Sequence, residues 1–138
     1  YEGGRLQLSL VESAYLIRSG IIEVSPRDGE KMTFESFVKY SESIEGDFMR
    51  KYSTYENLRN RGLVVKTGFK FGSHFRVYEK FPEKHSKYLV HAVPLAKVFS
   101  LQELSRAVRL AHTVRKRMLF GYEEDGETRY MDIGRVKP

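Results

Sequence analysis

Residues 63–93 read LVVKTGFKFGSHFRVYEKFPEKHSKYLVHAV, and this stretch determines most of the fold that we predict. β-Branched and aromatic residues alternate there with polar ones, which is the period-two pattern of half-buried strands. Glycine and proline interrupt the pattern, as they do in turns between neighbouring strands. The stretch therefore predicts strands of one sheet at residues 63–66, 69–71, 74–78 and 88–93.

The sequence that follows predicts a helix and then a hairpin. Ser100 and Glu103 form a capping box, which opens a helix that runs to about Val114. Two further strands and the turn between them are expected at residues 117–122, 128–133 and 124–127. The Asp125-Gly126 pair in this turn is a strong hairpin signal. We expect residues 55–138 to form an α/β lobe in which helices flank a mixed central sheet.

Residues 1–54 predict a small mixed α/β lobe that precedes the sheet. Its expected elements are a strand at 5–10, a helix from Ser9 or Ser13 to Gly20, a strand at 21–24, a turn at 26–29, and helices capped by Thr33 and Asp47, the last ending at Gly62. The chain as a whole is therefore predicted to be α+β, with two lobes.

The composition is that of a globular protein. The 138 residues are 41% hydrophobic and 13% aromatic, which is enough for a packed core. No apolar run approaches the roughly 18 residues that cross a bilayer, and the first ten residues lack a secretory signal. The absence of cysteine excludes disulfides and thiolate metal sites. We therefore expect an intracellular, cytoplasmic protein that does not enter a membrane.

Positive charge is concentrated in one part of the chain. Residues 1–55 carry a net charge of −2, whereas residues 56–138 carry +8. A basic segment attracts polyanions through counterion release and long-range steering, which makes nucleic acid the leading partner class. An acidic protein or an anionic membrane surface ranks behind it, and the charge could also serve solubility alone.

The sequence does not favour metal or nucleotide chemistry. The closest approach to a metal-nuclease motif is Glu83-Lys84, which has the wrong spacing and no aspartate nearby. No glycine-rich loop with Gly-Lys-Ser/Thr precedes a helix. We therefore expect neither a metal nor another cofactor. Acid–base chemistry by histidine with a cationic helper remains, as in the attack of an RNA 2′-hydroxyl on its own phosphate.

Three residues are candidates for that chemistry because of their places in the predicted topology. Tyr78 ends one strand and His85 lies just before the next, so a short loop brings both to the same edge of the sheet. Lys116 lies where the long helix gives way to a strand, which is a second place from which a side chain can reach that edge. Each residue also has an ordinary explanation: a packed tyrosine, a loop histidine and a solvated lysine.

A family resemblance favours the catalytic interpretation of these residues. Four linked motifs occur in order: YENLRNRGLVVKTGFKFG at 55–72, FRVY at 75–78, HSKYLV at 85–90 and RLAHTVRKR at 109–117. Together they resemble the catalytic subunit of the tRNA splicing endonucleases, the tRNA-intron endonucleases best known from archaea. The resemblance covers about residues 52–135, and residues 6–24 are more loosely similar to the amino-terminal lobe of that family.

The resemblance implies a catalytic role for the second lobe, residues 55–138. It implies metal-independent cleavage of precursor tRNA at bulge-helix-bulge splice sites, which leaves 2′,3′-cyclic phosphate and 5′-hydroxyl ends. By motif, Tyr78 would be the general base, His85 the general acid and Lys116 the transition-state stabiliser. The roles of base and acid could be exchanged between Tyr78 and His85.

The resemblance also implies residues that bind RNA. In the family a pair of arginines pinches a splayed bulge base, and Arg109 fits the first of them by its place in the helix motif. For the second we nominate Arg129 or Arg135. Stacking of a guanidinium on an unpaired base is a general way of reading single-stranded RNA.

Assembly is expected because two cuts require two active sites at a fixed distance. The family forms homotetramers, heterotetramers of two catalytic and two structural subunits, or dimers of duplicated chains. The acidic turn resembles the family's loop that inserts into a basic cleft of a neighbouring subunit, and its carboxylates are Glu123, Glu124, Asp125 and Glu127. We expect a homotetramer or a heterotetramer with a structural subunit.

Two alternatives stay open at this point. The chain could be a non-catalytic RNA-binding or structural subunit of such a complex, which would suit the basic lobe and the acidic turn. It could also be a DNA-binding module, although no helix resembles a recognition helix rich in base-reading residues.

Overall fold

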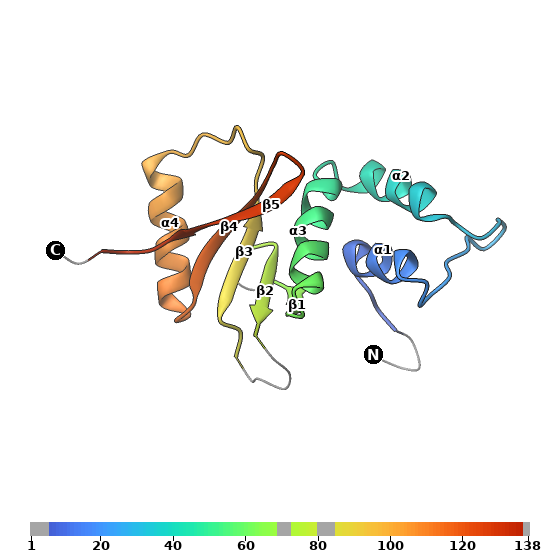
Figure 1. Ribbon diagram of the computed structural model, residues 1–138, viewed down its shortest axis with the longest axis horizontal. Helices are drawn as coiled ribbons and strands as arrows, with labels where there is room; N and C mark the ends of the chain where they lie inside the picture. The colour runs from blue at the N-terminus through green and yellow to red at the C-terminus, as the bar shows by residue number, and fades with distance from the viewer. Residues whose placement is uncertain (1–5, 69–72, 80–84, 137–138) are drawn as a thin grey trace. The chain divides into compact units, whose positions relative to one another are not determined.

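The computed structural model describes residues 6–68, 73–79 and 85–136 (Figure 1). The chain divides into two compact units, residues 1–52 and residues 53–138, which are described separately below. Within the described ranges, no helix combines the length and the apolarity needed to cross a bilayer.

A five-stranded mixed sheet forms the centre of the second unit. Its strands follow one another in space in chain order: β1 (Val64–Thr67), β2 (Phe75–Tyr78), β3 (Tyr88–Ala92), β4 (Arg117–Glu124) and β5 (Glu127–Ile133). Neighbouring strands are antiparallel except for β3 and β4, which are parallel. The connection between these two contains α4 (Leu101–Thr113), because parallel neighbours need a long crossover.

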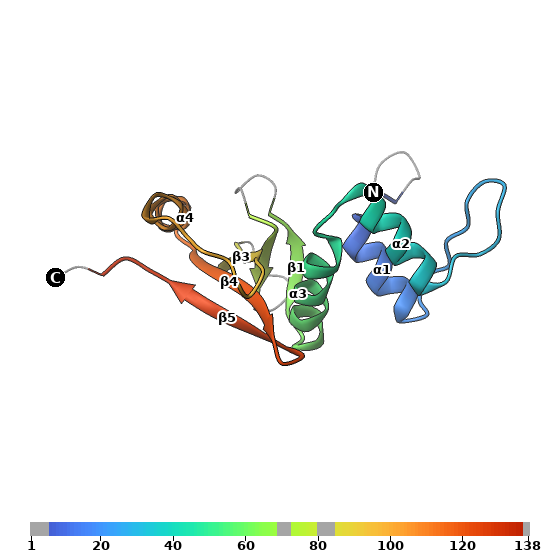
Figure 2. The same ribbon diagram turned by 90° about the horizontal axis from the view of Figure 1, so that it is seen from above.

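Helices cover both faces of this sheet (Figure 2). One face packs on α3 (Phe48–Asn60), where the rings of Tyr55 and Phe75 lie 5.7 Å apart. The approach is close at Gly121, where an added Cβ would lie 3.1 Å from the Thr54 side chain. The second unit therefore has three layers: the part of α3 that follows Tyr52, the sheet, and α4.

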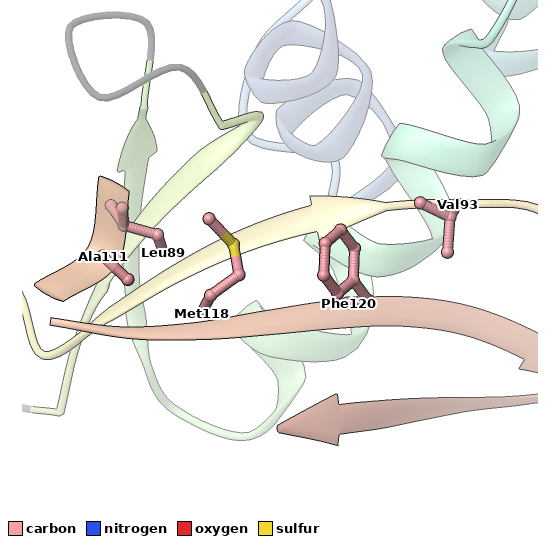
Figure 3. Packing of buried hydrophobic residues seen from close by; sticks show 5 residues of the cluster. All are labelled: Leu89, Val93, Ala111, Met118 and Phe120. Atoms are coloured by element: carbon pink, nitrogen blue, oxygen red, sulfur yellow. The ribbon is translucent and has the colours of Figure 1, made fainter. Parts of the chain in front are cut away.

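The opposite face packs on α4 through a buried apolar cluster (Figure 3). Leu89 and Val93 come from β3 and the residue after it, Met118 and Phe120 come from β4, and Ala111 comes from α4. Burial of each large apolar side chain contributes about 1.5–3 kcal/mol, so the cluster holds α4 against β3 and β4. This packing determines the position of the short segment that connects the end of α4 to the start of β4.

Three of the predicted signals at the helix and strand ends are confirmed. Ser100 and Glu103 form the capping box that starts α4. Asp125 and Gly126 have φ values of 52° and 78°, as a two-residue turn between antiparallel strands requires. Gly62 has a φ of 82° and ends α3. The α+β class of the chain is confirmed.

The first unit is helical over the residues described. Ser9 and Glu12 form a capping box at the start of α1 (Leu10–Arg18), and Thr33 caps α2 (Phe34–Ile44). Aromatic rings make part of the core, since Tyr52 lies 5.5 Å from Phe34 and 6.0 Å from Phe48 between ring centroids.

Two strands expected in the first lobe are wrong. Residues 6–9 are not in a strand, and the helix begins at Leu10 instead. Residues 21–24 lie in a loop, where the Met32 nitrogen donates a 2.7 Å hydrogen bond to the Val24 oxygen. An isolated pair of extended segments is marginal in water without a third strand or a packed face. The strand expected at 69–71 lies outside the described residues.

Candidate functional site

The strand register places the candidate residues Tyr78 and Lys116 at one edge of the sheet. Val77 lies opposite Tyr88 on β3, and Tyr88 lies beside Arg117 on β4. Tyr78 and Lys116 are the next residues toward the same edge, beyond these pairs. Two backbone bonds continue the ladder there, from the Lys87 nitrogen to Val77 at 2.9 Å and from the Arg117 nitrogen to Lys87 at 3.2 Å.

Tyr78 and Lys116 also belong to the same face. Side chains alternate along a strand, so Tyr78 shares a face with Arg76, and Lys116 shares a face with Met118. Arg76 lies opposite Leu89, which in turn lies beside Met118 in the cluster under α4. Both candidates therefore belong to the α4 side of the sheet.

The Tyr78 side chain is held in a packed position. It is 7% exposed and is the last residue of β2. The ammonium group of Lys66 lies 5.8 Å from the centroid of its ring, within the range of a cation–π contact. A phenol held in this way has little freedom to leave the edge of the sheet.

A Schellman motif at the end of α4 positions Lys116 at this edge. The Lys116 nitrogen bonds the Ala111 oxygen at 2.8 Å, and the Arg115 nitrogen bonds the His112 oxygen at 3.1 Å. Arg115 has the positive φ of 59° that the motif requires. Gly20 and Gly62 occupy the same position after α1 and α3. Arg115 therefore adopts a backbone conformation that is lower in free energy for glycine than for arginine.

Lys116 contacts the segment that carries His85. Its Nζ donates a 2.9 Å hydrogen bond to the backbone oxygen of Ser86, the residue directly after His85. Burial, together with repulsion from Arg76, lowers the pKa of Lys116 below its usual value. The His85 side chain is exposed to solvent, while Ser86 is buried. The structure thus brings together Tyr78, Lys116 and the backbone next to His85.

Two of the three arginines nominated for RNA contact lie in one groove. Arg109, on α4, and Arg135, after β5, both line a groove of about 390 Å³, together with His112. Arg129 lies near the hairpin turn instead, where its guanidinium is 3.9 Å from Glu124 and 3.5 Å from Glu127. Arg135, and not Arg129, therefore lies in the same groove as Arg109.

The acidic turn is anchored to α3 by a polar network. The Tyr130 hydroxyl donates a 2.7 Å hydrogen bond to Asn57, and Arg61 lies 5.4 Å from the centroid of the Tyr130 ring. Burial raises the pKa of Tyr130 to about 12, although Arg61 opposes the shift. Glu123 and Glu127 line a hollow of about 400 Å³ together with Asn57 and Arg61. The strand that follows the turn is thus tied to α3.

Sequence reasoning assigned no role to three basic residues near these sites. Lys66 and Arg76 lie opposite each other on β1 and β2, which becomes visible only when the register is known. His112 shares the groove with Arg109 and follows it by three residues, a spacing that could have suggested a common helix face. Among the residues that the structure describes, no three His, Cys, Asp or Glu side chains form a group suited to a metal ion.

Two family models match the chain. Residues 48–130 match the catalytic C-terminal domain of tRNA intron endonuclease, and residues 1–38 match its N-terminal domain. The match to the catalytic model includes the edge that carries Tyr78, His85 and Lys116, and it covers more than half of the chain.

Curated relatives agree with these matches. A tRNA-splicing endonuclease of Methanosarcina mazei is 56% identical over 139 residues, which cover 96% of this chain and 39% of that protein. One of Thermococcus kodakarensis is 43% identical, over 97% of this chain and 80% of that protein. One of Pyrococcus abyssi is 42% identical, over 99% and 79%. The chain belongs to the tRNA intron endonuclease family.

Proposed function

We propose that the protein containing this chain cuts precursor tRNA at both ends of an intron. The proposed sites of cleavage are bulge-helix-bulge elements, and the reaction needs no metal ion. The observation that carries the proposal is the hydrogen bond between Lys116 and the carbonyl after His85, at the edge where Tyr78 ends β2. Family membership supports the substrate class, since the relatives are named for tRNA splicing.

The proposed step is an internal transesterification. The 2′-oxygen forms a bond to the neighbouring phosphorus while the bond from phosphorus to the 5′-oxygen breaks. One group accepts the proton of the 2′-hydroxyl, and another donates a proton to the departing oxygen. Tyr78 and His85 take these two roles, with Tyr78 as base and His85 as acid, or the reverse. The products are a 2′,3′-cyclic phosphate and a 5′-hydroxyl.

Lys116 is suited to stabilise the charge that develops on the phosphate oxygens. Its Nζ is already fixed by the Ser86 carbonyl, so little reorganisation is needed when the substrate binds. Partial burial strengthens its interaction with an anion because the local dielectric constant is lower than that of water.

Arg109 and Arg135 are proposed to hold a base of the RNA bulge. They line one groove, and stacking on an unpaired base contributes about 1–3 kcal/mol. Arg129 is less suited, because Glu124 and Glu127 lie beside its guanidinium. We assign the second contact to Arg135.

The proposed assembly holds two active sites at the spacing of the two cuts. It would be a homotetramer or a heterotetramer with a structural subunit. The turn that contains Glu123, Glu124, Asp125 and Glu127 is the proposed contact with a neighbouring subunit. Its anchoring to α3 through Tyr130 supports this role, because a fixed charged loop loses less entropy on docking.

The test uses the full-length protein and a bulge-helix-bulge precursor RNA in excess EDTA. Wild-type protein should cut at both splice sites and leave cyclic phosphate ends, while His85→Ala should bind the RNA and leave it uncut. A requirement for added metal, or full activity in His85→Ala, would refute the proposal. A full-length protein that binds the RNA and never cuts it would indicate a non-catalytic subunit instead.

A further inference from the structure

Two basic residues at the end of α4 are not engaged by the rest of the fold. His112 lies in the last turn of the helix, and Arg115 follows the helix with a φ of 59°. Both residues are exposed. Within the part of the chain that the structure describes, neither side chain makes a hydrogen bond, an ion pair or a ring contact. Both side chains are therefore available to a ligand.

These two residues lie between the two places where RNA binding is proposed above. His112 lines the groove that also contains Arg109 and Arg135. Arg115 directly precedes Lys116, which lies at the edge of the sheet proposed for cleavage. Arg109 lies about one turn before the end of α4, which is about 5.4 Å along the helix axis. An RNA strand that takes the shortest path from the groove to this edge passes the last turn of α4.

The backbone conformation of Arg115 is a second, independent observation. Glycine is lower in free energy than arginine at this φ, and glycine occupies the equivalent position after α1 and α3, at Gly20 and Gly62. Among the described residues, no contact of the Arg115 side chain offsets this cost. Non-glycine residues held in this conformation are concentrated at functional sites and ligand-binding sites. The conformation of Arg115 therefore points to binding outside the fold.

We propose that Arg115 binds the RNA phosphate that lies between the linkage that is cut and the base held in the groove, and that His112 contacts the nucleoside attached to this phosphate. The inference rests on the proposed function and adds to it the residues that guide the strand from the groove to the cleavage site. A guanidinium suits two oxygens of a phosphate because its N–H groups form a planar fork. An imidazole can hydrogen-bond a 2′-hydroxyl or a base edge.

Basic residues near the end of a helix have another established use. They stabilise the helix by interacting with its last carbonyl groups and with its dipole. This explanation fits the positions of His112 and Arg115 without any RNA. The two explanations differ in what they predict for unfolding and for RNA binding.

The test compares Arg115→Gln, Arg115→Gly and Arg115→Lys in the full-length protein, with Lys39→Gln as the charge-matched control. Lys39 is exposed on α2, in the other unit. The probe is a bulged precursor RNA with a 2′-deoxy group at the cut site, so that binding is measured without cleavage. Arg115→Gln and Arg115→Gly should each weaken binding about fivefold at 0.1 M salt and reduce the salt slope by about 0.7. Arg115→Lys retains the charge and should keep the slope of the wild type.

A change in the RNA locates the contact. Each phosphate within two nucleotides of the cut, other than the one that is cut, is replaced in turn by an uncharged methylphosphonate. At the phosphate that Arg115 binds, the replacement should weaken binding by the wild type and have little further effect on Arg115→Gln, because both changes remove the same interaction. Losses that add at every position would overturn the assignment of Arg115.

Urea unfolding separates phosphate binding from a role in the helix. Arg115→Gly relieves the positive φ and should raise the unfolding midpoint, whereas Arg115→Gln keeps that backbone conformation. Both should weaken RNA binding equally, so the loss of affinity does not follow stability. If Arg115→Gln lowers the midpoint and leaves RNA binding unchanged, the charge serves the helix alone and the proposal is refuted for Arg115.

His112→Ala tests the second contact. It should weaken binding of the same RNA by about 2- to 10-fold, as the loss of one hydrogen bond does, and leave the salt slope unchanged. A reduced slope would place His112 on a phosphate, and an unchanged affinity would exclude it from the path of the strand. Either result refutes the role proposed for His112.

The remaining outcomes separate this inference from the proposed function. If the wild type cuts normal RNA and both Arg115→Gln and His112→Ala match Lys39→Gln in affinity, the strand does not pass the end of α4 and the proposed function stands. If the wild type does not cut the RNA, the proposed function fails, and this inference fails with it.

Discussion

Lys116 donates a 2.9 Å hydrogen bond to the carbonyl of Ser86, a residue 30 positions earlier in the chain. The bond joins the start of β4 to the segment that enters β3, and these two strands are parallel neighbours. It fixes a cation beside the residue that follows His85. This contact relates two parts of the candidate site that come from separate motifs of the sequence.

Lys116→Ala should impair the chemical step far more than RNA binding. Removal of one preorganised group that stabilises developing charge lowers rates by about 10²–10³. We expect a fall of that order in the single-turnover rate, with a change of less than about tenfold in the RNA dissociation constant. A proportionate loss of affinity with an unchanged rate would show that Lys116 only binds RNA. Lys39→Gln is the control and should retain both quantities.

Arg115→Gly should stabilise the protein. Arg115 has a φ of 59°, which costs a non-glycine residue about 1 kcal/mol relative to glycine. Urea denaturation should show a free energy of unfolding about 1 kcal/mol higher in the variant.

The matched variant for that prediction is Gly62→Ala, at the equivalent position after α3. Its φ of 82° should make alanine destabilising by about 1 kcal/mol. A loss of stability in Arg115→Gly would mean that the arginine side chain contributes more than its backbone conformation costs.

Arg109→Ala and Arg135→Ala should each weaken binding of a bulged RNA by about 5- to 100-fold, because each removes one stacking partner. A fully paired RNA of the same length should be affected much less. Arg129→Ala, which lies by the hairpin turn, is the internal comparison and should have the smallest effect on bulge discrimination. A larger effect for Arg129→Ala than for Arg135→Ala would reverse the assignment of the second arginine.

Tyr130→Phe should remove a pH-dependent part of the stability. Burial raises the pKa of Tyr130 to about 12, whereas a tyrosine in an unfolded chain titrates near 10. Between these values the folded state retains the proton that the unfolded chain loses, so the free energy of unfolding falls as the pH rises. The phenylalanine variant lacks this loss.

The wild type should exceed Tyr130→Phe by about 1 kcal/mol at pH 7, from the hydrogen bond to Asn57. The difference should narrow when urea denaturation is repeated between pH 10 and 12. A difference that stays constant over that range would show that Tyr130 ionises equally in both states.

Local signals in the sequence predicted much of the fold. The Ser100–Glu103 capping box and the Asp125-Gly126 turn each depend on a few adjacent residues, and both are present. The strand expected at 5–10 failed because alternation alone does not supply a neighbouring strand. Ser9 and Glu12 form a capping box that favoured the helix over the strand at that point.

The site was less accessible to sequence reasoning, because its contacts cross between elements. The facing of Lys66 and Arg76 depends on the register of two strands, and a shift of one residue would place them on opposite faces. The choice between Arg129 and Arg135 depends on which end of β5 meets α4. The catalytic roles of Tyr78, His85 and Lys116 stay predictions until they are measured.

The most direct test of the account removes one oxygen atom, that of a 2′-hydroxyl group, from the substrate. A precursor RNA with a 2′-deoxy nucleotide at one splice site is incubated with the full-length protein in excess EDTA. We predict that this site stays intact while the unmodified site is cut, with unchanged binding, since the missing oxygen is the proposed nucleophile. Cleavage at the modified site at the normal rate would contradict the account, because water or another nucleophile would then be doing the chemistry.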